Sequence, residues 1–302
     1  MSAAFSIIDA HQHFWDPVMN YHPWLRDDPP VSFRYGDYGA IRRRYLPSAY
    51  LADAGSYAIS GTVYVETEWD PSDPLGETRY AEKLKRETGL PTVSVAQAWL
   101  DHDDCAAVLE AQASFPFVRS IRHKPRANAE ATDSAPGGMA DATWRAGYAH
   151  LARNGLRFDL QTPWWHLHEA AQLARDFPDT QIILNHTGLP SERNPSGLEG
   201  WQRAMGMLAR CPNVAVKISG LGQRGQPWTV AANRAIVLTT IDLFGASRCM
   251  FASNFPVDSL CGDFDTIFSG FREIVRDFSE IEQRALFHHN ANRIYAMGLN
   301  DE

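Results

Sequence analysis

Two histidines stand two residues apart near the start of the chain, in the stretch Ile8-Asp9-Ala10-His11-Gln12-His13. The apolar residues just before them are typical of a buried strand that ends at this point. Because side chains two apart on a strand point to the same side, both imidazoles can face one centre. Two converging imidazoles suit a divalent metal such as zinc, provided that further ligands come from elsewhere in the fold.

A third histidine follows another apolar run, Ile182-Ile183-Leu184-Asn185-His186. For His186 alone, a hydrogen-bonded core histidine is the better interpretation, but three histidines at the ends of two strands favour a functional site. We therefore predict His11, His13 and His186 as metal ligands, with zinc as the metal. A site in which these histidines contact substrate without a metal stays open as the alternative.

Short runs of apolar and β-branched residues recur along the whole chain and predict the strands that carry these histidines. Between the runs, apolar residues recur at three- and four-residue spacing, which predicts amphipathic helices. The predicted strands cover residues 6–9, 59–65, 92–98, 117–121, 156–160, 181–184, 214–218 and 249–252. The clearest predicted helices cover residues 103–114, 165–177, 199–210, 231–244 and 265–278.

The spacing of these runs predicts how the strands are arranged. From His11 to Asn254 the repeat averages about 35 residues, as expected of one strand plus one helix. Eight such units predict an α/β fold, a (β/α)8 TIM barrel that forms a single domain over residues 1–302. A doubly wound sheet is the alternative, but the first strand lacks the glycine-rich turn that it favours. Two long segments, residues 14–45 and 125–141, follow predicted strands, so they would form loops at the C-terminal face of the barrel.

Motifs spread over residues 7–295 resemble those of the amidohydrolase superfamily, in its amidohydrolase-2 branch. The resemblance is closest to the sugar-lactone lactonases and 2-pyrone-4,6-dicarboxylate lactonase, and it implies a barrel with a hydrolytic site built on the three histidines. Each motif alone is common, whereas the ordered set is specific. The motifs are Ile8-Asp9-Ala10-His11-Gln12-His13-Phe14-Trp15, Ser120-Ile121-Arg122-His123, Asn185-His186-Thr187-Gly188-Leu189-Pro190, Val216-Lys217-Ile218-Ser219-Gly220-Leu221, Phe251-Ala252-Ser253-Asn254-Phe255-Pro256 and Asn290-Ala291-Asn292-Arg293-Ile294-Tyr295.

One catalytic position departs from the pattern of that family. Its members usually carry an aspartate after the eighth strand, which accepts the proton of the attacking water, and here Asn254 stands in its place. An amide lacks the basicity of a carboxylate, so Asn254 can hold a water or weakly ligate a metal but cannot be the base. Three explanations stay open: the base has moved, a metal lowers the pKa of the water, or the chain is not a hydrolase.

Glu66 is the candidate that we favour for a displaced base, because it ends a predicted strand and can face the mouth of the barrel. Glu68, Asp159 and Asp258 are the other acidic candidates. An ion pair with Arg122 or Lys217 inside the barrel is an equally good interpretation of Glu66.

Cationic, polar and aromatic side chains near the strand ends predict the groups that bind substrate. Arginine pairs bidentately with carboxylates, and indole rings stack on the faces of sugars and lactones. Packing of the loops is the commoner role of tryptophan, and for Lys217 an ion pair with Asp159 is slightly favoured over substrate binding. The predicted substrate-binding residues are Trp15, Arg122, His123, Lys124, Gln161, Trp164, Lys217 and Arg224.

The composition restricts the class of partner. The chain has 28 Lys and Arg against 36 Asp and Glu, a formal net charge of −8, which argues against nucleic acid. It has no apolar run of about 18 residues, which argues against a membrane span. Residues 1–5 lack the features of a signal peptide, and the 4 cysteines form no CxxC pair. We expect a cytoplasmic protein with a small anionic or polyhydroxylated substrate, and a homo-oligomer is compatible with the sequence.

These features and the resemblance together predict a hydrolase that opens a lactone of a sugar acid or of a carboxylated intermediate of aromatic catabolism. Water would attack the carbonyl, which His186 or a metal would polarise, and Arg122 would hold a carboxylate or a hydroxyl group. A decarboxylase or hydratase of a related acid on the same barrel is the alternative. A non-catalytic protein that binds sugar acids is a third, because of Asn254.

Overall fold

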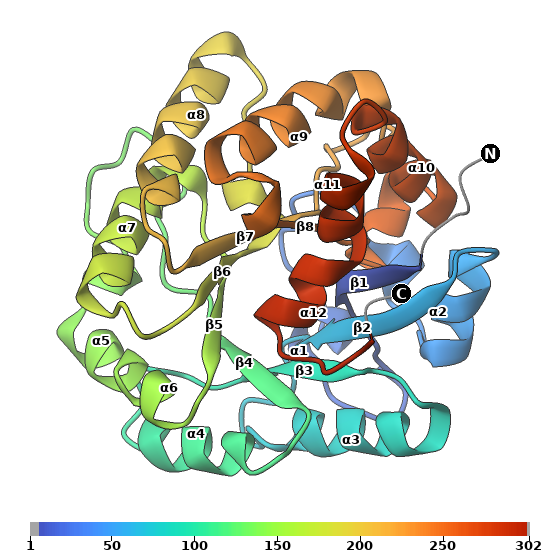
Figure 1. Ribbon diagram of the computed structural model, residues 1–302. Helices are drawn as coiled ribbons and strands as arrows, with labels where there is room; N and C mark the ends of the chain where they lie inside the picture. Colours follow the sequence, from blue (N-terminus) through green and yellow to red (C-terminus); the bar gives the residue numbers. More distant parts are fainter. Residues whose placement is uncertain (1–5, 301–302) are drawn as a thin grey trace.

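Eight parallel strands lie side by side in the order β1 to β8 in the computed structural model, which describes residues 6–300 (Figure 1). Every predicted strand is present, with ends that differ by at most three residues, and the predicted (β/α)8 barrel is confirmed. Most strand residues are buried, which explains their apolar composition. The strands are β1 (Ile7–Gln12), β2 (Ile59–Val65), β3 (Val93–Gln97), β4 (Val118–Arg122), β5 (Arg157–Leu160), β6 (Ile182–Leu184), β7 (Val214–Ile218) and β8 (Cys249–Phe251).

The barrel closes between the end of β1 and the residues that follow β8. His13 N donates to Phe255 O at 2.8 Å, and Asn254 N donates to His11 O at 2.8 Å. The buried carboxylate of Asp9 joins the same two segments, because it accepts from Ser253 N at 2.9 Å and from Ser253 Oγ at 2.6 Å. Closure therefore holds the histidine pair of β1 beside Asn254.

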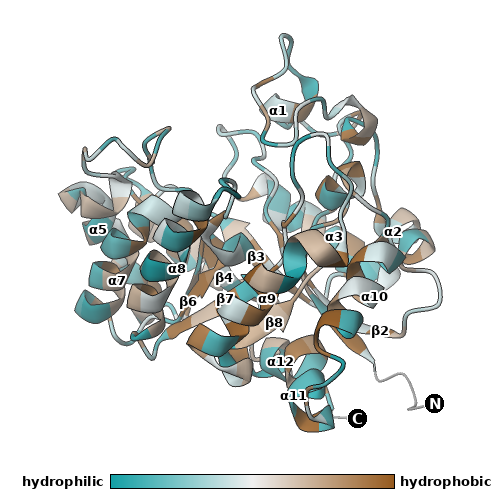
Figure 2. Cartoon of the chain, turned by 90° about the horizontal axis from the view of Figure 1, so that it is seen from above, coloured by the Kyte–Doolittle hydropathy of each residue, from teal (hydrophilic) through white to brown (hydrophobic). Residues whose placement is uncertain are grey.

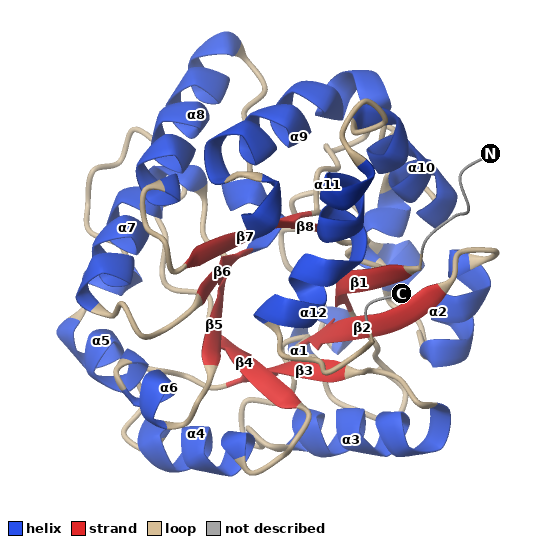
Figure 3. Cartoon of the chain, viewed as in Figure 1, coloured by secondary structure: helices blue, strands red, loops and turns tan. Residues whose placement is uncertain are grey.

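Helices surround the strands, as Figure 3 shows in blue around red. The predicted helix 199–210 begins four residues earlier, at Pro195, because the Asn194 side chain caps it by accepting from Gly197 N. The predicted helix 265–278 ends at Ile274. The α-helices are α1 (Pro23–Arg26), α2 (Pro47–Ala54), α3 (Gly76–Thr88), α4 (Cys105–Ala113), α5 (Ala142–Tyr148), α6 (His150–Arg153), α7 (Leu167–Asp176), α8 (Pro195–Ala209), α9 (Val230–Phe244), α10 (Phe264–Ile274), α11 (Glu280–Arg284) and α12 (Asn290–Ile294).

The two ends of the barrel are covered by different parts of the chain. Helices α11 and α12 lie at one end, and the segment 14–45 with α1 projects from the other (Figure 2). Aromatic rings hold this segment together: the Trp24 ring lies 5.4 Å from Trp15 and 5.9 Å from Phe33, between centroids. The long segment thus forms a packed cover over the C-terminal ends of the strands, where barrels carry their active sites.

A buried ion pair lies inside the barrel. Lys217 Nζ is 2.6 Å from Asp159 Oδ1, and both side chains are 0% exposed. The hydroxyl of Tyr295, just after α12, donates to the same carboxylate at 2.8 Å. The ion pair with Asp159, which the sequence slightly favoured over substrate binding for Lys217, is the arrangement present, and it encloses the ammonium group. No helix within residues 6–300 is both long and apolar enough to cross a membrane.

We expect Lys217→Met to lower the free energy of unfolding by about 3–5 kcal/mol, because it leaves the Asp159 carboxylate buried without its cation. Urea unfolding would measure this. The double variant Lys217→Met/Asp159→Asn should be more stable than Lys217→Met, since neither charge remains. Lys83→Met on α3, whose ammonium lies 4.0 Å from Glu87 and is 60% exposed, is the matched control and should leave stability unchanged. A cost for Lys217→Met no larger than that of the control would contradict this role of the pair.

Candidate active site

A cavity of about 380 Å³ lies at the C-terminal ends of the strands, beneath the segment 14–45. We call it the central cavity. Seven of the residues predicted from sequence line it, from the ends of β1, β4, β5, β6 and β8. They are His13, Trp15, Arg122, Lys124, Gln161, His186 and Asn254. The position of these residues at strand ends therefore predicted most of the polar lining of the cavity.

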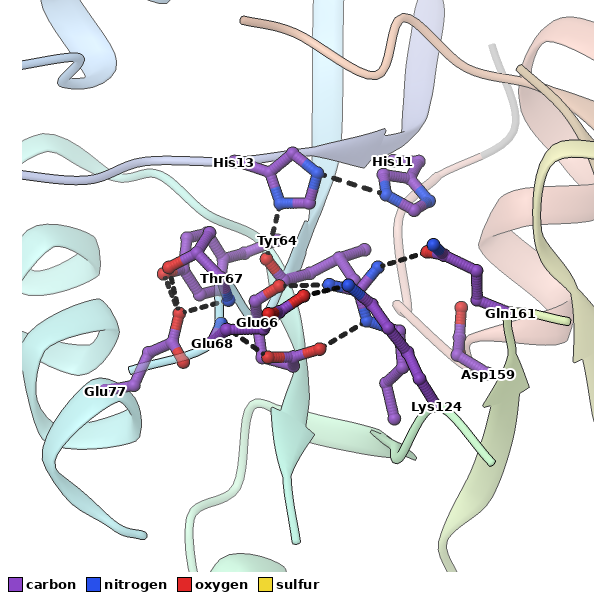
Figure 4. A network of polar contacts seen from close by, with 12 residues as sticks. His11, His13, Tyr64, Glu66, Thr67, Glu68, Glu77, Lys124, Asp159 and Gln161 are labelled. Atoms are coloured by element: carbon purple, nitrogen blue, oxygen red, sulfur yellow. Dashed lines mark hydrogen bonds and ion pairs between the residues drawn. The ribbon is translucent and has the colours of Figure 1, made fainter. Parts of the chain in front are cut away.

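The three predicted histidines meet at the base of this cavity. His11 Nε2 lies 3.3 Å from His13 Nε2, and the His11 ring centroid lies 4.6 Å from that of His186 (His11 and His13, Figure 4). Burial lowers the pKa of His13 to about 3. Burial, with the nearby cations, also holds the pKa values of His11 and His186 well below their ordinary range. All three rings are therefore neutral at physiological pH.

The tautomer of His13 follows from its partner. His13 Nδ1 lies 2.8 Å from Val65 O, and a carbonyl oxygen can only accept, so Nδ1 carries the proton. In the neutral ring Nε2 then presents its lone pair. Asn254 Oδ1, a second acceptor, lies 3.4 Å from that nitrogen. Two acceptors thus converge at the base of the cavity.

The donor set matches the predicted zinc site only in part. Two imidazole nitrogens on one tetrahedral zinc would lie about 3.3 Å apart, a separation that His11 and His13 do show. His186 Nδ1 lies 2.9 Å from Ser219 Oγ, which leaves Nε2 as the ring nitrogen of His186 that is free to ligate. Across residues 6–300, no three His, Cys, Asp or Glu side chains are grouped so that they could hold a metal ion. The usual carboxylate ligand is also replaced by the Asn254 amide.

A carboxylate lies directly behind that amide. Asn254 Nδ2 donates to Asp258 Oδ1 at 2.6 Å, and the hydroxyl of Tyr35 donates to the same oxygen at 2.9 Å. These bonds turn the amide oxygen of Asn254 toward His13. Burial raises the pKa of Asp258 to about 6, although Arg34 and the hydrogen bonds from Asn254 and Tyr35 oppose this rise.

Glu66, the predicted base, is engaged with another side chain. It forms a buried ion pair with Arg122, and its second carboxylate oxygen accepts from Glu68 N at 2.7 Å (Figure 4). The Arg122 guanidinium also donates to Glu66 O and, at 3.1 Å, to Gln161 Oε1. Glu66 does not line the central cavity, whereas Arg122 does. The alternative interpretation of Glu66, an ion pair with Arg122, is the arrangement present.

Three further predicted residues lie away from the central cavity. His123 Nδ1 accepts from Leu100 N at 3.0 Å and from Trp144 Nε1 at 3.1 Å, so it holds neighbouring loops together. The Trp164 ring packs against Gly200, where an added Cβ would come within 2.6 Å of it. Arg224 lines a second, adjoining cavity. The sequence correctly placed these side chains near strand ends, but it did not predict the direction in which they point.

Arg34 is a residue of the central cavity that the sequence did not single out. It comes from the long segment 14–45, stacks 4.5 Å from the Tyr35 ring centroid and donates to Gly220 O at 3.3 Å. None of the described carboxylates lies within ion-pair distance of its guanidinium, while Arg122 and Lys124 pair with Glu66 and Glu68. Only tertiary packing brings Arg34 to the cavity, so no local pattern could have identified it.

A barrel with histidines at the ends of β1 and β6 and a polar side chain after β8 defines an amidohydrolase-type site. The model of the family described as "Amidohydrolase" matches residues 8–297, and the chain belongs to this family of enzymes. It is 41% identical, over 96% of its length and 98% of the other chain, to an uncharacterised protein from Sinorhizobium fredii. It is 29% identical to an L-fucono-1,5-lactonase from Burkholderia ambifaria, over 85% of this chain and 82% of the relative. The predicted membership is thereby confirmed.

Solved structures agree with this assignment. An amidohydrolase from Burkholderia multivorans with bound zinc superposes with a TM-score of 0.78 at 25% identity, over 97% of this chain and 99% of that chain. A 2,6-dihydroxybenzoate decarboxylase from Rhizobium has a TM-score of 0.66 at 13% identity, over 97% and 99% of the two chains. This second likeness is one of fold alone, so the fold does not choose between hydrolysis and decarboxylation.

We expect Asn254→Asp, which installs the aspartate usual in the family, to destabilise this protein by about 1–3 kcal/mol at pH 8. It would place two carboxylates in contact, at a separation of 2.6 Å in the present structure. The cost should shrink at pH 5, where the pair can bind a proton. The exchange variant Asn254→Asp/Asp258→Asn keeps one carboxylate and one amide, and it should recover most of the stability. Chemical denaturation at both pH values measures this; no gain in the exchange variant would disprove the coupling.

Proposed function

We propose that the protein is a lactonase that opens a cyclic ester by attack of water in the central cavity. The observation that carries the proposal is the convergence of His13 Nε2 and Asn254 Oδ1, 3.4 Å apart, beside the cations of the cavity. Acceptors on one side suit a water molecule, and donors on the other suit a carbonyl oxygen that gains negative charge. The lactonase relatives support the same reaction.

His13 is the proposed acceptor of the proton of the water. Its Nε2 is unprotonated because Nδ1 donates to Val65 O, and its pKa of about 3 means that the ring is neutral at physiological pH. The cation formed is stabilised by Asn254 Oδ1 and by the charge of Glu66. Asp258 polarises the Asn254 amide from behind, so it supplies from a distance the negative charge that the family aspartate supplies directly.

The oxyanion is the proposed partner of Arg122 and His186. Both line the central cavity, and Glu66 and Gln161 hold the guanidinium of Arg122 in place. We therefore assign Glu66 the orientation of Arg122 in place of the role of base. The rings of Trp15, Trp24 and Phe33 form an apolar wall against which a lactone ring can stack. Gln161 and Lys124 remain as donors for its hydroxyl groups.

No step of this mechanism passes through a metal, because no group of three His, Cys, Asp or Glu side chains within residues 6–300 is arranged to hold one. We test the proposal with sugar-acid lactones, muconolactones and carboxylated pyrones, and measure metal content by elemental analysis in parallel. We expect turnover of at least one lactone, which His13→Gln lowers by about 10²–10⁴-fold in kcat/KM. His102→Gln, at an exposed histidine outside the cavity, is the control and should behave as the wild type.

Two outcomes would overturn parts of the proposal. Release of carbon dioxide from carboxylated aromatics, without turnover of any lactone, would show the decarboxylase alternative to be right. After dialysis against a chelator we expect kcat to change by less than about twofold. A loss of activity that zinc restores would instead establish a metal mechanism.

We expect kcat/KM to fall as the pH drops below about 6, because Asp258 then gains a proton and no longer polarises Asn254. The sign follows from the raised pKa: the carboxylate is charged above about pH 6 and neutral below it. Asp258→Asn should lower kcat and flatten the profile between about pH 5 and 7. An inflection that persists in this variant would assign the titration to another group. Stopped assays at constant ionic strength measure the profile.

A further inference from the structure

A second cavity of about 400 Å³ adjoins the central cavity, and the two share Arg34 and Leu189 in their walls. Its walls come from the segment 14–45 and from the loops that follow β5, β6 and β7. Of the residues that belong to this cavity alone, only Tyr35 contributes to the proposed reaction, through its hydrogen bond to Asp258. It is therefore a space beside the reacting groups without an assigned role.

The lining of this second cavity is strongly cationic. Three arginines, Arg34, Arg193 and Arg224, contribute to it, and no Asp or Glu is among the described residues that line it. This concentration of positive charge stands in a chain of formal net charge −8. An enclosed surface of one sign attracts ligands of the other sign.

The three guanidinium groups differ in what they already bind. Arg193 donates to the carbonyl oxygens of Pro190 and Leu221, which anchors it in the wall. Arg224 and Arg34 form no ion pair with a carboxylate of residues 6–300, and Arg34 keeps only its bond to Gly220 O. The side chains of Ser191, Gln223 and Gln226 add neutral hydrogen-bonding groups to the same walls.

Gly220 lines the second cavity and lies beside His186, which lines the central cavity. Its φ of +62° favours glycine, and an added Cβ would lie 2.4 Å from His186 Nδ1 and 2.8 Å from Arg34 Nη2. The proposed oxyanion-binding histidine and the shared arginine therefore both lie against the same face of one glycine. Arg34 and Leu189 line both cavities, so the two spaces meet at these residues.

We infer that the second cavity binds an anionic group, a carboxylate or a phosphate, at the far end of a substrate whose lactone ring lies in the central cavity. Arginine is the residue best suited to hold either group through paired hydrogen bonds. The preferred substrate is then an acidic lactone that opens to a product with two anionic groups, rather than a neutral sugar lactone. This inference rests on the proposed lactonase function for the identity of the ring, but anion binding can be measured without turnover.

The ring-opened acids are suitable probes, because they bind without reacting. Isothermal titration calorimetry of the full chain would compare D-gluconate, which has one carboxylate, with D-glucarate and 6-phospho-D-gluconate, which carry a second anionic group. We expect at least one of the two larger anions to bind roughly tenfold or more tightly than D-gluconate. The tighter of the two identifies the group as carboxylate or phosphate.

Substitutions then locate the second anionic group. Arg224→Gln should reduce the preference for the larger anion by roughly tenfold, and Arg34→Gln should do the same while also weakening D-gluconate. Arg86→Gln, an exposed arginine on α3, is the matched control and should keep the wild-type preference. Equal affinities for all three acids, or a preference that survives Arg224→Gln, would overturn the inference. Anion binding without turnover of any lactone would support the anion site in the second cavity and refute the lactonase proposal.

Discussion

The closure of the barrel between β1 and β8 is the constraint on which the site depends. A sheet of eight strands becomes a barrel only if its first and last strands meet, and both of these end in residues of the site. The Asp9 carboxylate binds both segments, because it accepts from His11 N on one side and from Ser253 N and Oγ on the other. Tyr50, on α2, donates to it as well. The fold and the placement of the imidazoles thus share one set of hydrogen bonds.

The electrostatics of the site follow from where its charges are buried. The three histidines are neutral because they are desolvated among cations, which disfavour a further positive charge. The negative charge usual after the eighth strand lies one helical turn later, at Asp258, and reaches the cavity through an amide. Glu66 is used to fix Arg122. Asp258 and Glu66 therefore act through a neighbour and not on the ligand directly.

The sequence predicted the fold well because buried parallel strands leave apolar runs at a regular interval. It located the histidines because strand ends in a barrel face one centre. It favoured the ion pair of Lys217 with Asp159 only slightly, since alternation along β7 gives the inward direction of the side chain but not its depth within the barrel. It did not give the orientation of His123 and Trp164, which depends on packing against Trp144 and Gly200. The position of Arg34 depends on how the long segment 14–45 folds, and no periodicity of apolar residues predicts that.

The hydrogen bond between Asn254 and Asp258 lies between the features that the sequence predicts and those that it does not. A spacing of four residues would place the two side chains together on a single helical turn, so the sequence held the signal. This spacing predicts a contact between the two side chains only if Asn254 is expected to need a partner that orients its amide. Polar groups that act through one another are harder to find than groups that meet a ligand, because each looks ordinary alone.

Gly220 restricts which substitutions can alter the activity of this enzyme. Any side chain at this position would press on His186 and on Arg34 at once. Reactivity and substrate preference therefore cannot be altered independently here, and a variant selected for a new ligand would inherit a change in rate. New specificities are more accessible through Arg224, which lines the second cavity but not the central one.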